Sequence, residues 1–233
     1  MRIKITVSIA SMLFVFSAFS ESNDLNSLKW IVKSDYDNLI VFKAVKKHES
    51  GLIPLKVQTT LNYPISRVVS VLTNAERKKE WVPRLVKAYT VKKIALGEFV
   101  DYVSFDAPWP FTNRDFLVYI KCDFNLKNEE IHSKIHSISL PEVPIKKNFI
   151  RGHTHSGNTF LRSVSGGTKT YMEMAFLSDY KGNIPKWIIN IVQTKWPRRL
   201  VKRLRTQLAK NDIVDQYKER LASEKEKYIT DRK

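Results

Sequence analysis

Apolar and polar residues alternate along most of the central part of the chain, a pattern typical of half-buried β-strands. Two earlier runs, 39–47 and 55–61, are β-rich and are separated by a turn at 49–51. The alternation predicts further strands at 84–94, 98–105, 114–124, 130–138, 149–155, 158–164 and 168–178. Because short turns join these runs without helical crossovers, we expect them to form one antiparallel sheet.

Helical spacing of apolar residues appears before the long β-rich region. After Pro64, apolar residues between 65 and 72 recur on one helix face, and 75–81 suggests one more turn. The apolar residues at 28–32 suggest a short helix or a capping segment.

The longest helical pattern begins after Pro185 and continues past residue 220, with a kink or a restart expected at Pro197. A sheet with one apolar face has to cover that face, and this helix is long enough to do so. The pattern therefore predicts an α+β fold, in which a curved antiparallel β-sheet wraps around a long C-terminal α-helix. We expect an internal apolar cavity between the sheet and the helix, and a polar tail at 222–233.

Composition narrows the class of protein. With 233 residues, of which 43% are hydrophobic, the chain can form one domain with a sizeable core, and disorder throughout is excluded. The single cysteine, Cys122, excludes an internal disulfide framework and any CxxC metal or redox motif. The formal net charge of +17 favours anionic partners: nucleic acid, an anionic membrane surface or acidic ligands.

The N-terminus has the features of a secretory signal peptide. Arg2 and Lys4 precede an uncharged stretch, 5–19, and small residues stand at the −3 and −1 positions of a cleavage site. An uncleaved anchor is the alternative, but the stretch is shorter than the about 20 residues that span a bilayer. We therefore expect a signal peptide at 1–20, an exported product that is periplasmic or secreted, and no nucleic acid partner.

Four stretches, in order along the chain, resemble the START family of lipid-transfer domains. Residues 106–116 (DAPWPFTNRDF) are similar to the PWP…RDF signature of that family. The other matches are EWVP at 80–83, DYKGNIPKWIIN at 179–190, and Trp30 with the strands at 40–43 and 55–57. The resemblance implies the helix-grip fold over 21–221 and non-enzymatic binding of a lipid, which the protein would carry between membranes. We expect a monomer.

Common catalytic motifs do not occur in the sequence: it has no GxSxG, HExxH, P-loop or GxGxxG. His132 and His136 share a strand face, as do His153 and His155, but no cysteine or carboxylate lies within two residues of the second pair. We therefore expect no enzyme, no cofactor and no metal site. Two alternatives stay open: an enzyme on the same fold, since helix-grip relatives include cyclases and aromatases, and an envelope interaction domain with a vestigial cavity.

Arg114 is the charged residue most open to interpretation. In a strand over 114–124 it shares a face with apolar residues, so it is expected to point inward. A buried guanidinium needs a carboxylate, a carbonyl or a polar ligand group, and Asp101 is the nearest inward acid. In START domains the matching arginine lies deep in the tunnel near an acid, whose position here is occupied by Lys87. Arg114 is therefore either a ligand contact or a structural residue that binds carbonyl oxygens near the turn at 109–110.

Further ligand contacts are expected on the strands and on the terminal helix. The expected contacts are Arg114, Asp101, Phe116, Val118, Trp109, Trp187, Ile188 and Ile191. The loop at 139–145 matches by position the loop that closes the tunnel mouth in START domains. Leu140, Val143 and Ile145 are therefore expected to form a lid, with a loop packed under the terminal helix as the alternative.

The terminal helix is basic on the side opposite its apolar stripe. Leu200 and Leu204 lie on the apolar side, and Arg199, Lys202 and Arg203 lie on the basic side. This basic side is either solvated surface or a docking face for an anionic membrane, where each cation contributes about 1 kcal/mol.

Overall fold

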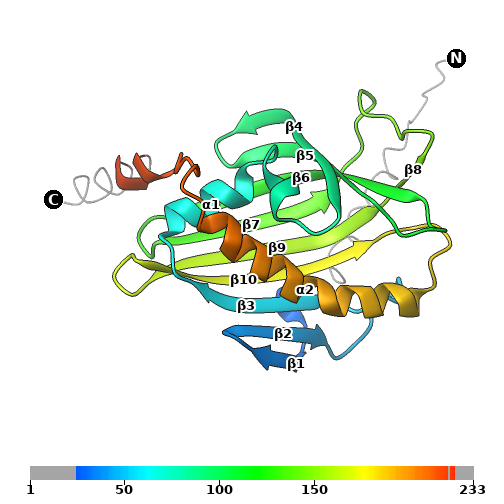
Figure 1. Ribbon diagram of the computed structural model, residues 1–233, viewed down its shortest axis with the longest axis horizontal. Helices are drawn as coiled ribbons and strands as arrows, with labels where there is room; N and C mark the ends of the chain where they lie inside the picture. Colours follow the sequence, from blue (N-terminus) through cyan, green and yellow to red (C-terminus); the bar gives the residue numbers. More distant parts are fainter. Residues whose placement is uncertain (1–24, 220, 224–233) are drawn as a thin grey trace, which may run out of the picture.

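The computed structural model describes residues 25–219 and 221–223, so the predicted signal peptide at 1–20 and most of the predicted tail at 222–233 lie outside the described residues. In this part of the chain, ten strands form one sheet that curves around a long helix (Figure 1). The strands are β1 (Trp30–Tyr36), β2 (Leu39–Ala44), β3 (Leu55–Leu61), β4 (Leu85–Ala95), β5 (Glu98–Phe105), β6 (Asn113–Asn125), β7 (Glu130–Ser137), β8 (Phe149–Arg151), β9 (His153–Val164) and β10 (Lys169–Asp179).

The strands follow the order β1-β2-β3-β10-β9-β7-β6-β5-β4, and each pairing along this path is antiparallel. β8 lies off this path and pairs with β6 in parallel. The predicted α+β class and antiparallel sheet are confirmed, but the strands expected at 149–155 and 158–164 are divided differently. Gly152 separates β8 from an unbroken β9. A Cβ at this position would lie 2.3 Å from the ring of Phe116, so the close approach of this ring requires glycine.

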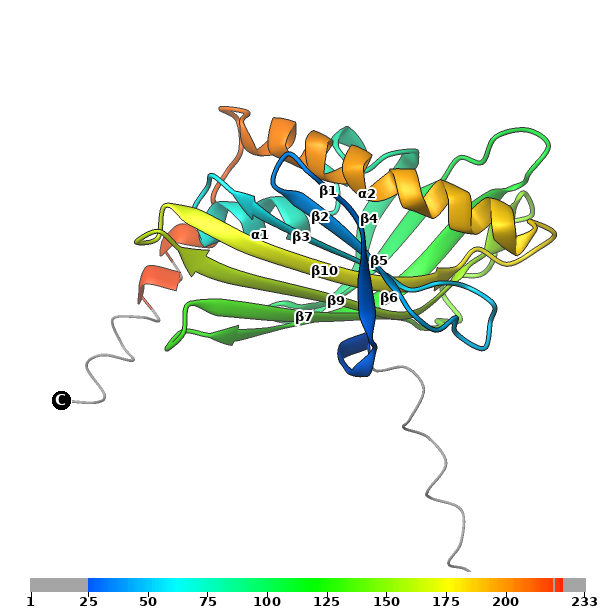
Figure 2. The same cartoon turned by 90° about the horizontal axis from the view of Figure 1, so that it is seen from below.

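Two α-helices lie on the concave side of the sheet in the described residues, α1 (Ile65–Thr73) and α2 (Lys186–Leu208), and α2 runs along its length (Figure 2). The chain also has two short 3-10 helices, η1 (Leu25–Ser27) and η2 (Lys78–Glu80), and short helical stretches at 218–219 and 221–223. Pro197 lies inside α2 and does not restart it. None of the described helices is long and apolar enough to cross a membrane.

α2 ends at Leu208, so the predicted helix past residue 220 is not continuous, and helical backbone returns only at 218–219 and 221–223. Arg67 on α1 donates from Nε to the carbonyl oxygen of Leu208 at 3.0 Å, and from Nη2 to that of Lys210 at 2.6 Å. These bonds satisfy carbonyl groups at the helix end, where no further turn supplies donors. The chain then turns away, and Tyr217 is buried in the main core.

The prediction of a short helix or cap at 28–32 is also wrong, because this segment leads into β1. Asp37 and Asn38 have left-handed backbone conformations, with φ of 53° and 54°, and such a pair makes the two-residue turn of a β-hairpin. The turn pairs β1 with β2, and β1 becomes an edge strand with mostly exposed side chains.

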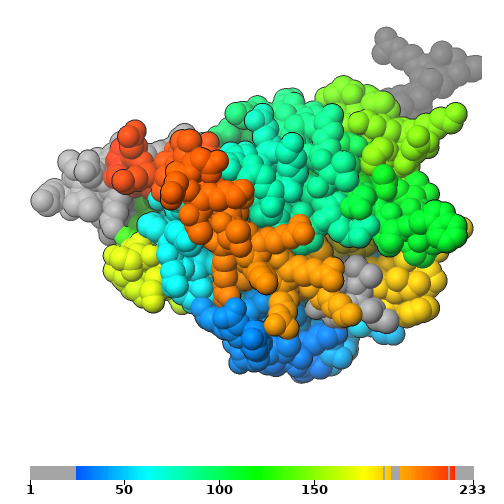
Figure 3. All heavy atoms as spheres, viewed as in Figure 1, coloured from blue at the N-terminus to red at the C-terminus, as the bar shows by residue number. Residues whose placement is uncertain are grey.

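The main core lies between the concave face of the sheet and the two helices. Leu200 and Leu204 of α2 are fully buried in it, as the apolar stripe predicts. On the molecular surface, α2 forms a band between the β1–β2 hairpin and the region of α1 and β4 (Figure 3). A separate apolar cluster around Tyr102 and Leu117 lies on the outer face of the sheet.

Candidate functional site

A cavity of about 270 Å³ lies between the helices and the concave face of the sheet. Phe116 and Val118 line it from β6, as their strand parity predicts, and Phe99 lines it from β5. Trp196 and Leu200 line it from α2. Most of the lining side chains are apolar, so the cavity, which we call the main cavity, suits the hydrocarbon part of a ligand.

Lys78 is a charged member of this lining. It lies on η2, and its Nζ is 2.6 Å from Oδ2 of Asp101. Thr90 donates from Oγ1 to Oδ1 of the same carboxylate at 2.8 Å. Asp101 is 0% exposed, so it points inward as predicted, but its partner is Lys78 and not Arg114. The pair places a neutralised, hydrogen-bonded group beside a largely apolar wall.

Lys78 is not among the predicted site residues, because it belongs to a run of charged residues, 76–80, that has the composition of solvated surface. The feature of the sequence that could have indicated Lys78 is Trp81, a large apolar residue directly after the charged run. Trp81 is buried, so the chain enters the core within three residues of Lys78. Which cation turns inward depends on the 3-10 turn of η2. Trp81 also lines the main cavity, and its indole Nε1 is buried with no hydrogen-bond partner among the residues described.

Cys122 is buried and lines the main cavity as well. Burial raises the pKa of its thiol above the usual range. A neutral thiol behaves as a small apolar group. Farther along the lining, Thr154 and Ser178 bring their hydroxyl oxygens to 3.1 Å from each other, so these polar groups satisfy one another.

Arg114 is 3% exposed and points inward, but it binds backbone carbonyl groups. It donates to the carbonyl oxygens of Tyr180 and Lys181, each at 3.3 Å, and to that of Thr112. Burial lowers the pKa of the guanidinium below its usual range. This geometry is that of the structural role, in which Arg114 joins the start of β6 to the turn between β10 and α2.

Arg114 also lines a smaller cavity of about 120 Å³. The loop at 106–111 and the start of α2 form its cover, and Ile188 is one of its lining residues. The smaller cavity and the main cavity share the lining residues Phe105, Tyr180 and Trp196. The two spaces are therefore neighbours, with Arg114 close to their boundary.

Two expected contacts lie elsewhere. Trp109 is 93% exposed in the 106–111 loop, and Trp187 is 65% exposed at the start of α2; neither lines a cavity described here. The prediction of these contacts is corrected for two reasons. The helical period turns Ile189 inward and Trp187 outward, and Trp109 lies in a turn, where strand parity does not apply. The side chain of Ile191 lies outside the described residues.

The loop at 139–145 does not cover the main cavity. Leu140 and Val143 contact the Tyr102–Leu117 cluster on the outer face of the sheet, and Ile145 is exposed. Behind this loop, Arg151 forms an ion pair with the buried Asp115, with Nε 2.8 Å from Oδ1. The expected lid is therefore corrected to a loop packed on the outer face. The apolar residues next to Pro141 and Pro144 indicated burial, but the sequence does not say against which face.

The basic side of α2 is divided between paired and unpaired cations. Arg205 forms an ion pair with Asp37 in the β1–β2 turn, with Nη1 2.7 Å from Oδ2. Arg199, Lys202 and Arg203 are exposed, and none of them takes part in an ion pair within the described part of the chain. These three cations form what we call the basic face.

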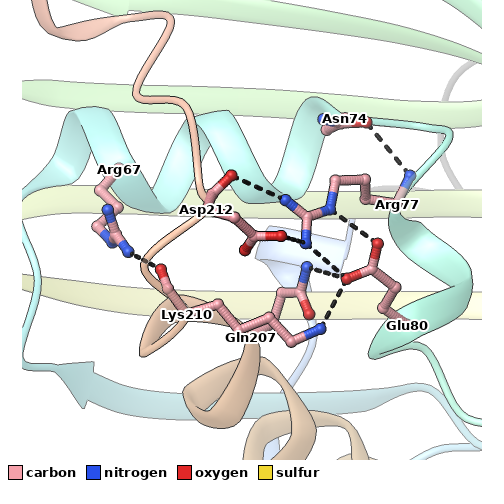
Figure 4. A network of polar contacts seen from close by, with 7 residues as sticks. All are labelled: Arg67, Asn74, Arg77, Glu80, Gln207, Lys210 and Asp212. Carbon is pink, nitrogen blue, oxygen red and sulfur yellow. Dashed lines mark hydrogen bonds and ion pairs between the residues drawn. The ribbon is translucent and has the colours of Figure 1, made fainter.

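The end of α2 is held by a polar network (Figure 4). Oε2 of Glu80 accepts hydrogen bonds from Lys210 at 2.7 Å and from Gln207 at 2.9 Å. Arg77 bridges Glu80 and Asp212, with Nη2 2.9 Å from Oδ2 of Asp212. Hydrogen bonds from Arg77 and Lys210 hold the pKa of Glu80 well below its usual range. The network therefore connects the end of α2 to η2, the element that carries Lys78.

Three histidines cluster where β9 begins. The rings of His153 and His155 lie 4.7 Å apart between centroids, and those of His155 and His48 lie 4.8 Å apart. Burial lowers the pKa of both His153 and His155, and neighbouring positive groups lower it further. Within residues 25–219 and 221–223, no group of three or more His, Cys, Asp or Glu side chains is placed to hold a metal ion.

A sequence model of the START domain matches residues 18–211. The chain belongs to the START domain family. START domain-containing protein 10 of Mus musculus is 23% identical to it over 132 residues, which cover 54% of this chain and 43% of that protein. This START domain thus spans less than half the length of that relative. Phosphatidylcholine transfer protein of Rattus norvegicus is 25% identical over 170 residues, covering 71% of this chain and 77% of the relative.

The fold of this START domain is shared with solved structures. The STAR-related lipid transfer protein from Xanthomonas axonopodis has a TM-score of 0.69 and 22% identity, and the match covers 78% of this chain and 99% of that one. The likeness confirms the helix-grip fold.

Proposed function

We propose that this START domain binds one lipid, or an apolar molecule of similar size, in the main cavity and does not convert it chemically. The observation that carries the proposal is the cavity of about 270 Å³ between α2 and the concave face, with its largely apolar lining. Moving hydrocarbon from water into such a space is favourable by about 0.8 kcal/mol per methylene group. The similarity to phosphatidylcholine transfer protein supports a lipid as the ligand class.

Transfer between membranes is the second part of the proposal. The ligand would pass between the start of α2 and the 106–111 loop, which together cover the smaller cavity. Trp187 and Trp109 expose their indole rings on these two segments, and tryptophan favours the interface between lipid and water. The basic face of α2 would attract an anionic membrane, so docking would bring this cover to the interface.

Export as a monomer is the third part. Arg2 and Lys4, the uncharged stretch at 5–19 and the small residues that follow it support a cleaved signal peptide. The intact mass of the exported protein is expected to place its N-terminus at Glu21 or within a few residues of it. A full-length product in the cytosol would contradict export without affecting lipid binding.

Native mass spectrometry of the gently purified protein, followed by lipid extraction, tests the binding proposal. We expect one lipid per chain in the wild type. Val118→Trp places a large ring in the main cavity and should remove most of the bound lipid. Tyr119→Trp, on the other face of the same strand, is the matched control and should retain it.

Two results would overturn the proposal. The first is a wild-type protein without lipid, both as purified and after incubation with phospholipid vesicles. The second is turnover, in which the extracted molecule is a chemically changed form of the lipid that was supplied.

A further inference from the structure

A further cavity, of about 330 Å³, lies at the opposite end of the concave face from Arg114. The first turn of α1, the β6–β7 and β9–β10 turns, and the C-terminal residues Lys218, Leu221 and Ala222 line it. We call it the distal cavity. Its apolar lining includes Ile65, Phe124, Leu126, Ile131 and Leu221.

The distal cavity lies next to the main cavity along two of the strands. On each of them, the next inward-pointing residue after the last one that lines the main cavity lines the distal cavity. On β6, Cys122 lines the main cavity and Phe124 lines the distal one. On β9 the same step leads from Leu161 to Ser163. Because inward residues alternate along a strand, both cavities lie on the same concave face.

Ile131 on β7 lines both cavities, so its side chain stands at their boundary. It is 3% exposed, and no charged residue shares that boundary position. Beyond it, the ring of Phe124 stacks on Tyr217 with centroids 6.0 Å apart. Polar groups, among them Glu130 and Lys218, also line the distal cavity, so apolar and polar walls meet there.

We propose that the distal cavity receives the methyl end of a long acyl chain whose first part lies in the main cavity. The inference rests on the proposed lipid-binding function and adds to it a means of selecting chain length. An aliphatic chain can pass Ile131 if this side chain changes rotamer. The isoleucine side chain makes no hydrogen bond or ion pair, so none has to be broken. A chain too short to reach Ile131 would fill the main cavity alone.

A fatty acid series from lauric to arachidic acid, competing against a fluorescent fatty acid, is the probe. Each added methylene that is buried should raise the affinity about fourfold, and a methylene left in water should add nothing. For the wild type we expect the affinity to rise through the longest chains. Ser163→Phe fills the distal cavity and should lower the affinity for the longest chains about tenfold or more, while that for lauric acid stays unchanged.

Val164→Phe is the matched control, because it adds the same ring on the other face of β9 and should keep the wild-type profile. Ile131→Ala widens the boundary and should increase the preference for long chains; if it does not fold, Ser163→Phe still decides. Identical profiles for Ser163→Phe and the wild type would overturn the inference and leave the proposed function intact. If no chain binds the wild type, the inference falls, and the lipid extraction described above decides the proposed function separately.

Discussion

Lys78 and Asp101 form an ion pair on the concave side of the sheet, with Nζ 2.6 Å from Oδ2. The carboxylate is completely buried, and the lysine side chain is almost so. The pair joins η2 to β5 beside the main cavity, while the polar network at the end of α2 holds η2 from its other side. The position of α2 and the polar wall of the cavity therefore depend on one short helical turn.

Lys78→Met is expected to lower the free energy of unfolding by about 3–5 kcal/mol, because it leaves the carboxylate of Asp101 buried without its cation. The double variant Lys78→Met/Asp101→Leu should recover most of this loss, since apolar groups then replace both charges. Urea unfolding of the wild type and the two variants measures the difference. Equal losses in the single and the double variant would contradict a coupled pair.

Arg114→Met is expected to lower the free energy of unfolding by at least about 1–3 kcal/mol, because the carbonyl groups of Thr112, Tyr180 and Lys181 lose their donor. Arg114→Lys should be intermediate, since an ammonium group cannot reproduce the planar fork of a guanidinium. The extracted lipids should be the same in all three proteins. Normal stability together with a changed lipid would instead make Arg114 a ligand contact.

The basic face of α2 is expected to direct binding to anionic vesicles. Changing Arg199, Lys202 and Arg203 to Gln should weaken vesicle binding strongly at low salt and much less at physiological salt, where charges are screened over about 8 Å. Lipid already in the cavity should remain, because these side chains point away from Leu200 and Leu204. Vesicle sedimentation at two salt concentrations measures the effect.

The matched control for the basic face has the same loss of charge on another surface. Lys121, Lys127 and Lys134 are exposed on β6, β7 and the turn between them, and changing them to Gln should leave vesicle binding nearly unchanged. Equal weakening by both triple variants would show that net charge, and not the basic face, drives binding.

Stability is expected to fall as the pH drops below about 6.5, the usual pKa of histidine. Burial, followed by repulsion from the neighbouring His153, lowers the pKa of His155, and burial together with Lys181 lowers that of His153. The unfolded chain therefore binds these protons first, so the stabilisation present above this pH is lost as the pH falls toward the folded pKa values. His153→Gln/His155→Gln should flatten this part of the melting-temperature profile, and an unchanged slope would assign it to other groups.

Most of the sheet could be predicted, because alternation of apolar and polar residues follows directly from one buried and one solvated face. β1 could not, since an edge strand with exposed Ile31 and Val32 lacks that alternation. Its pairing depends on the left-handed turn at Asp37 and Asn38. The end of α2 could not be predicted either, because the helical spacing of apolar residues continues beyond the point where Arg67 binds the last carbonyl groups.

The same division applies to the site. Phe116 and Val118 were assigned to the cavity wall by parity alone, and the structure places them there. Lys78 and the loop at 139–145 were not placed correctly, because a charged run and an apolar loop can each pack in more than one direction.

The sequence alone determined the α+β class and the positions of most strands. It also determined which face of β6 points inward and which sides of α2 are apolar and basic. These properties are local, since each depends on the period of a strand or a helix and on which side is apolar. The tertiary structure decided the partners of the buried charges. Lys78 meets Asp101 and Arg114 meets the turn at 180–181, because the curvature of the sheet brings distant segments together, and no local period encodes contacts between residues so far apart in the chain.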